Sequence, residues 1–110
     1  MSVYPEMIEG LPEIDTPLEG IRGRLLQGET TQAVFFTIEP GARVPPHCHC
    51  AQWGLMIEGE MELTIGGKTD IYRKGDRYFI PEGVMHEAGF RTRVFVLDVF
   101  SDPTRYKAKA

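Results

Sequence analysis

Two histidines and two cysteines alternate over four consecutive positions in the segment GARVPPHCHCAQWG, residues 41–54. Imidazoles and thiols bind metals and carry redox chemistry. The run therefore fits half of a zinc site, a redox pair, or two imidazoles on one strand face beside two bystander thiols. Alternate residues of a strand share a face, so His47 and His49 should present their imidazoles together, with Cys48 and Cys50 opposite. This excludes one zinc site built from all four side chains and predicts outward-facing, chemically silent thiols.

A third histidine, His86, follows the segment PEGVM, whose Pro-Gly turn should start a new strand. A barrel can place that strand across from His47 and His49. The three imidazoles could then converge on one ion, at about 2.0–2.1 Å from each nitrogen. The two cysteines cannot provide a disulfide framework, because a bridge between residues two apart closes almost no loop.

Short β-rich runs must position these side chains. Glycine and proline interrupt the chain every eight to twelve residues. The runs between them predict strands over residues 20–27, 33–39, 53–58, 60–65, 68–73, 76–80 and 93–100. Many short strands in one small domain predict an all-β sandwich or barrel. Apolar and aromatic residues flank the histidine segments and are expected in the barrel core, with the wall of an apolar pocket around the bound ion as the alternative: Trp53, Leu55, Met56, Tyr78, Phe79, Met85 and Phe90.

The 110 residues are enough for one domain with a single core. We expect an N-terminal extension over residues 1–18, the β-barrel over residues 19–102 and a C-terminal tail over residues 103–110. Residues 3–9 could form one short helical turn. The tail ends in the basic segment RYKAKA, which we expect to be frayed rather than a binding arm.

Composition limits the partners of the chain. A net charge of −4 argues against nucleic acid or an anionic membrane as the main partner, because both reward clustered lysine and arginine. No stretch approaches the roughly 18 apolar residues of a membrane span. The first ten residues, MSVYPEMIEG, do not resemble a secretion signal. We therefore expect a cytoplasmic protein with reduced thiols.

Two ordered motifs give the chain a resemblance to the cupin superfamily, and to its small single-domain members. The first motif, G-x5-H-x-H-x3–4-E-x6-G, is matched by Gly41, His47, His49 and Gly59, with Gln52 in place of the glutamate. The second, G-x5-P-x-G-x2-H-x3-N, is matched by Gly75, Pro81, Gly83 and His86, with Phe90 in place of the asparagine. The resemblance implies a single antiparallel β-barrel of jelly-roll type. It also implies one divalent transition metal (Zn, Ni, Fe, Mn or Cu) held inside the barrel.

The resemblance assigns His47, His49, Gln52 and His86 as metal ligands, with one departure. The loop between His49 and Gln52 is one residue shorter than the pattern. Two ligand sets therefore stay open, three histidines with waters or three histidines with the amide. A glutamine leaves the charge of the ion uncompensated, which favours anionic ligands and makes the metal a stronger Lewis acid.

The C-terminal segment VLDVFSDPTR has a second, narrower resemblance, to the cupins that convert unsaturated uronates to linear ketouronates. In that group an Asp, a Phe and an Arg line the site. Asp98 and Phe100 match directly, and Arg105 lies one residue later than the pattern expects. An aspartate on an apolar strand is costly to bury without partners, which also marks Asp98. The alternative is an aspartate that faces solvent or pairs with Arg91 or Arg93.

These observations favour a metal-dependent lyase or isomerase that acts on a small carboxylate or sugar acid such as an unsaturated uronate. An Fe-dependent dioxygenase is the second enzymatic possibility. A barrel that binds or senses small molecules without chemistry is the third. The expected partner is an anionic small molecule. A homodimer is also expected, because apolar side chains such as those of AVFFTIE, residues 33–39, need cover.

Overall fold

A computed structural model describes residues 2–110. Its elements are α1 (Glu6–Glu9), β1 (Ile21–Gln27), β2 (Gln32–Ile38), β3 (Arg43–His47), β4 (Gln52–Glu58), β5 (Met61–Ile65), β6 (Lys68–Tyr72), β7 (Arg77–Ile80), β8 (His86–Phe90) and β9 (Val94–Phe100). The strands expected from the sequence agree with these bounds to within a residue or two. Within residues 2–110, no helix has the length and apolarity to cross a membrane.

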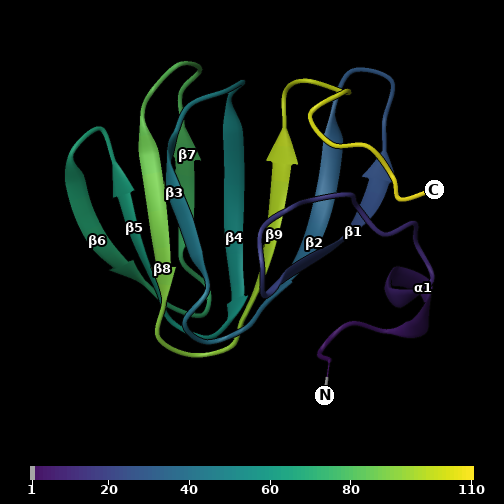
Figure 1. Ribbon diagram of the computed structural model, residues 1–110, viewed down its shortest axis with the longest axis horizontal. Helices are drawn as coiled ribbons and strands as arrows, with labels where there is room; N and C mark the ends of the chain where they lie inside the picture. The colour runs from purple at the N-terminus through teal and green to yellow at the C-terminus, as the bar shows by residue number, and fades with distance from the viewer. Residues whose placement is uncertain (1) are drawn as a thin grey trace.

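The nine strands form two antiparallel sheets. One sheet has the order β1-β2-β9-β4-β7 and the other the order β3-β8-β5-β6. The sheets pack as two layers, with β3 and β8 in front of the larger sheet in Figure 1. The predicted all-β fold of jelly-roll type is confirmed. Hydrogen bonding divides its strands into two sheets rather than one continuous barrel.

Strand alternation builds the core between the sheets. In β2 the side chains of Gln32, Val34, Phe36 and Ile38 are buried and the intervening ones are half-buried. Apolar side chains from both sheets meet them, including the fully buried Met56 of β4. Each large apolar side chain removed from water stabilises the fold by about 1.5–3 kcal/mol.

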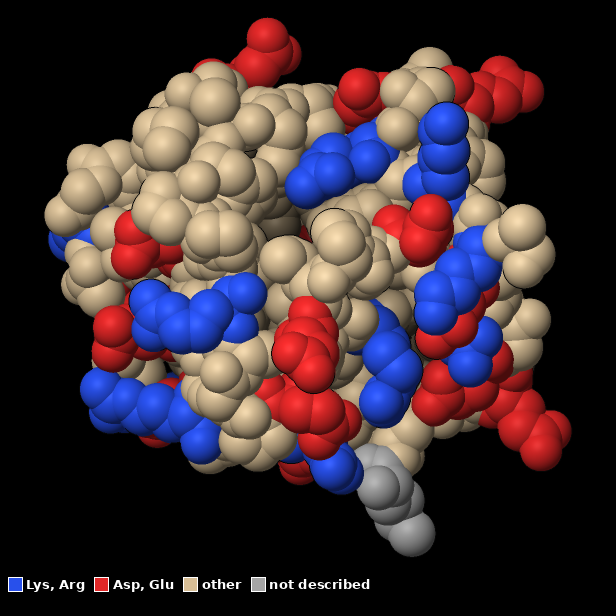
Figure 2. Space-filling model, in the orientation of Figure 1, with Lys and Arg blue, Asp and Glu red and all other residues tan. Residues whose placement is uncertain are grey.

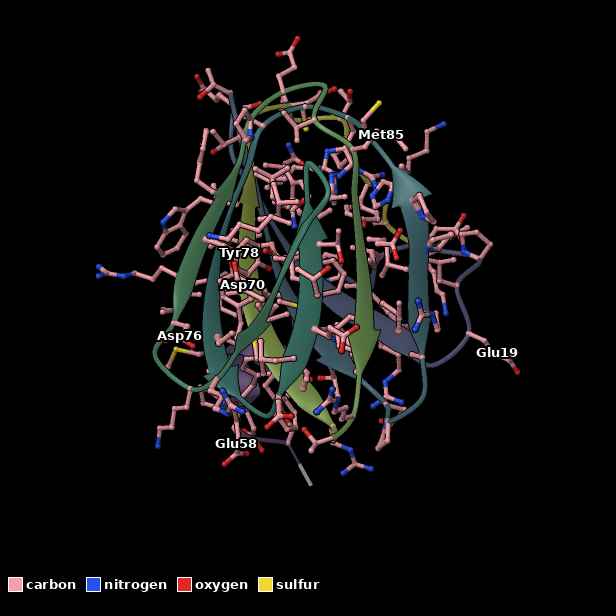
Figure 3. All side chains as sticks on the ribbon, turned by 90° about the vertical axis from the view of Figure 1, so that its left-hand side faces the viewer. Glu19, Glu58, Asp70, Asp76, Tyr78 and Met85 are labelled. Carbon is pink, nitrogen blue, oxygen red and sulfur yellow. The ribbon has the colours of Figure 1, made fainter. Side chains whose placement is uncertain are left out.

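The outward positions of the larger sheet correct one expectation. Trp53 and Phe79 were expected in the core, but they are 37% and 59% exposed. They are cross-strand neighbours of β4 and β7, and Gly54 and Tyr78 take the buried positions beside them. Met85 is 51% exposed, and Figure 3 shows it at the upper end of the molecule. The expected core was wrong for these three because alternation turns their positions outward or to the rim.

Both terminal segments pack on the domain. The Tyr4 hydroxyl donates to the Phe36 carbonyl at 2.6 Å. Ile14 is buried and forms a β-bridge with Ala108. The Lys109 amide donates to the Glu13 carbonyl at 2.8 Å. The expectation of a frayed tail was therefore wrong, because backbone pairing with residues 13–15 holds it. The division at residues 18 and 102 stays a prediction.

Candidate metal centre and pocket

The three histidines meet at one end of the space between the sheets. His47 ends β3 and His86 begins β8, and the two are direct cross-strand partners. Their ring centroids are 4.2 Å apart, and His49 lies 5.1 and 4.8 Å from them. One nitrogen of each ring lies within 4.8 Å of one nitrogen of each of the others. The three side chains could therefore hold one metal ion.

The structure positions His49 in a different way from the one expected from the sequence. β3 ends at His47, so His49 belongs to the following loop and strand alternation does not position it. The turn after β7 does so instead. The amide of Gly83 donates to the His49 carbonyl at 3.0 Å, with Gly83 at φ 77°, a conformation that favours glycine. The two histidine segments are thus joined by a backbone hydrogen bond.

Backbone carbonyls orient all three imidazoles. Nδ1 of His47 lies 2.9 Å from the Pro45 carbonyl, Nδ1 of His49 lies 2.7 Å from that of Cys50, and Nδ1 of His86 lies 3.0 Å from that of Val84. A carbonyl only accepts, so each Nδ1 carries the proton and each Nε2 keeps a lone pair. Nε2 of His86 is buried and has no hydrogen-bond partner within the described chain. Such an orphaned acceptor in a three-histidine cluster fits a metal ligand.

Burial keeps the rings of His49 and His86 neutral, as metal binding requires. Desolvation lowers the pKa of His49 from 6.5 to about 4, and the nearby Arg105 acts in the same direction. Burial also lowers the pKa of His86, with His47 and Arg105 adding to the effect. In both cases a backbone carbonyl opposes the shift and does not cancel it. Near neutral pH the lone pairs of His49 and His86 are therefore available.

The two cysteines do not share one environment. Cys48 is exposed, as expected. Cys50 is half-buried and packs against the core cluster, with its Sγ 3.8 Å from Nδ1 of His49. The expectation that both thiols point outward was wrong for Cys50, because the chain leaves the strand at His47 and alternation stops there. Both are free thiols.

A pocket of about 160 Å³ lies beside the histidines. Its walls come from both sheets, from Thr16 and Leu18 of the N-terminal segment, and from Arg105 and Tyr106 of the tail. Most of the lining is apolar, and its polar members include the three histidines, Gln52, Asp98 and Arg105. Gln52, the first residue of β4, lines this pocket together with the histidines. The apolar walls and few polar groups are typical of a small-molecule site.

Asp98 is buried inside this pocket. Its side chain is 3% exposed, and the Tyr78 hydroxyl donates to its Oδ1 at 2.5 Å. Burial raises the pKa of Asp98 from 3.8 to about 6, opposed by its contacts with Tyr78 and Gln52. Burial also raises the pKa of the Tyr78 phenol well above 10, and Asp98 adds to that shift. The alternative of a solvent-facing Asp98 is excluded.

Gly54 makes the contact between Tyr78 and Asp98 possible. It is the direct cross-strand partner of Tyr78 in β7 and of Asp98 in β9, so it lies between them on β4. A Cβ on Gly54 would lie 2.0 Å from the Tyr78 ring. The missing side chain lets the ring lie across β4 and reach the aspartate.

Arg105 and Phe100 also line the pocket. The Arg105 guanidinium carbon lies 4.4 Å from the ring centroid of Tyr106 and 5.8 Å from that of Phe100. The Phe100 ring also lies 5.7 Å from the ring of His49. Nε of Arg105 is buried and finds no partner among residues 2–110. An unpaired donor on a charged, half-buried group fits an anionic ligand.

The sequence marked Asp98, Phe100 and Arg105, but it predicted for Tyr78 only a place in the core or in an apolar pocket wall, with no polar role. The signal for Tyr78 was available. It shares the inward face of residues 76–80 with Ile80, and a phenol on an inward position needs a hydrogen-bond partner. The tail residue Tyr106 and the N-terminal residues Thr16 and Leu18 gave no such signal, because only the packing of the termini brings them to the pocket.

Comparison with known proteins identifies the family. A family model described as "Cupin domain" matches residues 34–100, more than half of the chain. The chain belongs to the cupin family. A comparison with curated proteins found no match.

Solved structures agree with this assignment. The cupin resembles KdgF from Halomonas sp. with a TM-score of 0.75 and 27% identity, over 84% of this chain and 88% of that one. An RmlC-like cupin from Shewanella frigidimarina gives a TM-score of 0.79 and 26% identity, over 96% of this chain and 94% of that one. Oxalate decarboxylase from Bacillus subtilis, a protein with Mn(II) centres, gives a TM-score of 0.71 and 26% identity. This cupin spans only 28% of its length.

Proposed function

We propose that this cupin is a metal-dependent isomerase or lyase that acts on a small carboxylate, with unsaturated uronates as the substrate class. The observation that carries the proposal is that three different kinds of chemical group line one pocket. These are the imidazole cluster, the unpaired guanidinium nitrogen of Arg105 and the buried carboxyl of Asp98. The resemblance to KdgF and the VLDVFSDPTR segment support the choice of uronates.

The metal ligands in this proposal are His47, His49 and His86, with Gln52 as the fourth. Support for Gln52 is that it lines the same pocket as the three histidines. A divalent ion bound there supplies a Lewis acid for a carboxylate or carbonyl oxygen. All four ligands are neutral, so the protein leaves the charge of the ion available to an anionic substrate.

Arg105 binds the substrate carboxylate. Its guanidinium carries several donors in a planar fork that suits a carboxylate, and its buried Nε lacks a partner within the described residues. The aromatic rings of Phe100 and Tyr106 support the guanidinium from its sides.

Asp98 carries the proton that the reaction moves. Opening an unsaturated uronate to a linear ketouronate shifts one proton from a hydroxyl to a ring carbon, with no net gain or loss of atoms. A carboxyl whose pKa is raised to about 6 can accept and return a proton near neutral pH. The Tyr78 hydroxyl donates to Oδ1, and the Gln52 side chain is the other polar contact of this carboxyl.

Metal analysis coupled to a substrate screen tests this function. Protein purified without chelator is analysed for metal and assayed with unsaturated uronates and other small carboxylates. We expect one transition metal per chain and turnover of a uronate, and we expect His86→Ala to lose both. Oxygen uptake with bound iron would indicate a dioxygenase instead. Binding of the acids without turnover would indicate a non-catalytic binding barrel.

The role of Gln52 has its own test. Gln52→Glu should tighten metal binding, because it adds a charged ligand, and should weaken the binding of anionic ligands. It should also raise the pKa of the neighbouring Asp98, because two carboxyls then face each other. Metal and galacturonate affinities measured by calorimetry check this. Unchanged affinity for both would show that Gln52 is not a ligand.

We further propose a homodimer in the cytoplasm. The outer face of the larger sheet exposes Trp53 and Phe79 side by side, and paired exposed aromatics are typical of a protein interface. The free thiols Cys48 and Cys50 suit a reducing compartment.

A further inference from the structure

Gln32 is a buried polar side chain that the proposed chemistry does not use. It is 1% exposed, and the other buried polar or charged side chains of the described chain are His86 and Asp98. Those two line the pocket, whereas Gln32 does not. Gln32 is the first residue of β2 and the cross-strand partner of Phe100 in β9. A buried amide costs free energy unless its partners are satisfied, so its hydrogen bonds indicate its purpose.

The Gln32 amide pairs with the backbone of one tail residue at two points. Its Nε2 donates to the Tyr106 carbonyl at 2.8 Å, and its Oε1 accepts from the Tyr106 amide at 2.9 Å. In a sheet, the peptide groups of a neighbouring strand would bond to the Tyr106 backbone. Here the Gln32 side-chain amide makes these bonds instead. Nε2 of Gln32 also donates to Oε1 of Gln27 at 2.9 Å.

Gln27 extends this contact to the other side of Arg105. Its Nε2 donates to the Pro103 carbonyl at 2.8 Å. The two glutamines therefore hold the tail at residues 103 and 106, which bracket Arg105. The bonds within the turn itself, from Thr104 and Arg105 to Asp102, shape the turn without attaching it to the sheet.

The fixed backbone determines where the guanidinium lies. The Tyr106 ring packs edge-on against Phe36 and Phe100, with centroids 6.0 and 5.4 Å away. The guanidinium of Arg105 stacks over this same ring. A shift of the Tyr106 backbone would therefore move both the ring and the guanidinium that rests on it.

We propose that Gln32 is a positioning residue that holds Arg105 in the pocket through the backbone of Tyr106, and so sets the affinity for the substrate carboxylate. This inference rests on the proposed role of Arg105 as the carboxylate-binding group. It adds that a residue outside the pocket, 73 positions earlier in the chain, controls that group. A misplacement of about 1 Å at a binding group can cost up to a hundredfold.

Calorimetric titration of Zn²⁺-loaded protein with galacturonate tests the inference. Gln32→Leu puts an apolar side chain of similar size at the same buried position and removes both bonds to Tyr106. We expect it to weaken galacturonate binding about tenfold, equivalent to about 1.4 kcal/mol. Zn²⁺ affinity, measured by competition with a chelator, should stay within about twofold of wild type, because the carbonyls that orient the three histidines lie outside the tail. In the Arg105→Ala background, Gln32→Leu should have no further effect on galacturonate affinity.

Two further variants keep the test decisive. Val94→Ala removes core volume at a fully buried position outside the pocket, and it should lower the melting temperature without changing galacturonate affinity. Gln27→Ala alters an exposed residue, so it keeps the fold even where Gln32→Leu fails to fold. It should weaken binding by about twofold to threefold. This smaller loss is expected because one of the two attachments remains.

The outcomes separate the two ideas. Normal galacturonate affinity in Arg105→Ala overturns the proposed role of Arg105, and the inference with it. Weak binding in Arg105→Ala with normal binding in Gln32→Leu and Gln27→Ala overturns the inference alone. Equal losses in Gln32→Leu and Val94→Ala would show that Gln32 contributes only to stability.

Discussion

At the scale of single residues, the chemistry depends on groups that burial has altered. Asp98 is held in a form that exchanges a proton near neutral pH, while His49 and His86 are kept neutral. The same low-polarity pocket causes both effects, since burial disfavours whichever form is charged. The same environment therefore raises the pKa of a carboxyl and lowers the pKa of an imidazole.

The raised pKa of Asp98 predicts a pH-dependent cost to stability. Between about 4 and about 6 the folded state keeps a proton that the unfolded state has released. Stability from this group is therefore greatest at low pH and falls as the pH rises through that window. The metal-free Asp98→Asn variant lacks this cost. Its free energy of unfolding relative to wild type should rise by about 2 kcal/mol between pH 4 and pH 7.

Denaturant unfolding at several pH values measures this difference. His49 and His86 act with the opposite sign, because their lowered pKa values make stability rise with pH over the same range. They are present in both proteins and cancel in the comparison. Parallel stability curves for Asp98→Asn and wild type would contradict the burial of an ionisable Asp98.

At the scale of elements, a glycine in the middle one of three neighbouring strands lets side chains of the two outer strands come into contact. β7, β4 and β9 present Tyr78, Gly54 and Asp98 in one cross-strand row. The phenol can cross β4 because nothing projects from the middle position. Figure 3 shows Tyr78 amid the side chains between the sheets. The glycine is required for close approach and not for a turn.

Gly54→Ala should therefore disturb the site and the fold together. The new Cβ would lie 2.0 Å from the Tyr78 ring, so the ring must move and its bond to Asp98 must lengthen or break. We expect a loss of about 1–3 kcal/mol in unfolding free energy, the usual cost of overpacking a core. Thermal unfolding measures the loss.

Gly89→Ala on β8 is the matched control. Its new Cβ would meet only the far end of the flexible Arg43 side chain, at 3.0 Å. We expect little change in melting temperature for this variant. A similar loss in both variants would show that strand glycines matter here for backbone freedom and not for the Tyr78 ring.

At the scale of the whole molecule, charge and apolar surface are distributed differently. Figure 2 shows acidic and basic side chains intermixed over the lower part of one face, and the upper left of that face is largely uncharged. Several surface arginines pair with glutamates, for example Arg93 with Glu39 at 2.9 Å. The pairing of Trp53 with Phe79 across β4 and β7 leaves an aromatic patch on the larger sheet.

Disruption of this patch tests the proposed homodimer. Trp53→Lys combined with Phe79→Lys should halve the mass seen by light scattering, from twice 12.4 kDa to 12.4 kDa, because like charges then meet at the interface. Met7→Lys alters a residue of α1 that is even more exposed and should leave the mass unchanged. A wild-type protein that is already monomeric would contradict the proposal.

The histidine motifs show how far local sequence could lead. The spacing of His47, His49 and His86 predicted a cluster, and the glycines between predicted strands placed the turns correctly. The role of His49 was predicted by a mechanism that does not operate, since β3 ends before it. The bond from Gly83 to the His49 carbonyl replaces strand alternation, and such a long-range contact has no local sequence signature.

By itself, the sequence determined the strands, the fold class, the three histidines and the marked aspartate, because these depend on periodicity, turn residues and the cost of burying charge. Only the tertiary structure decided that Tyr78 contacts Asp98 through the gap at Gly54. It also decided that the tail is ordered and that Gln32 holds it beside Arg105. The physical reason is that these contacts join segments 20 to 74 residues apart, and each depends on shape and hydrogen-bond geometry in the packed interior.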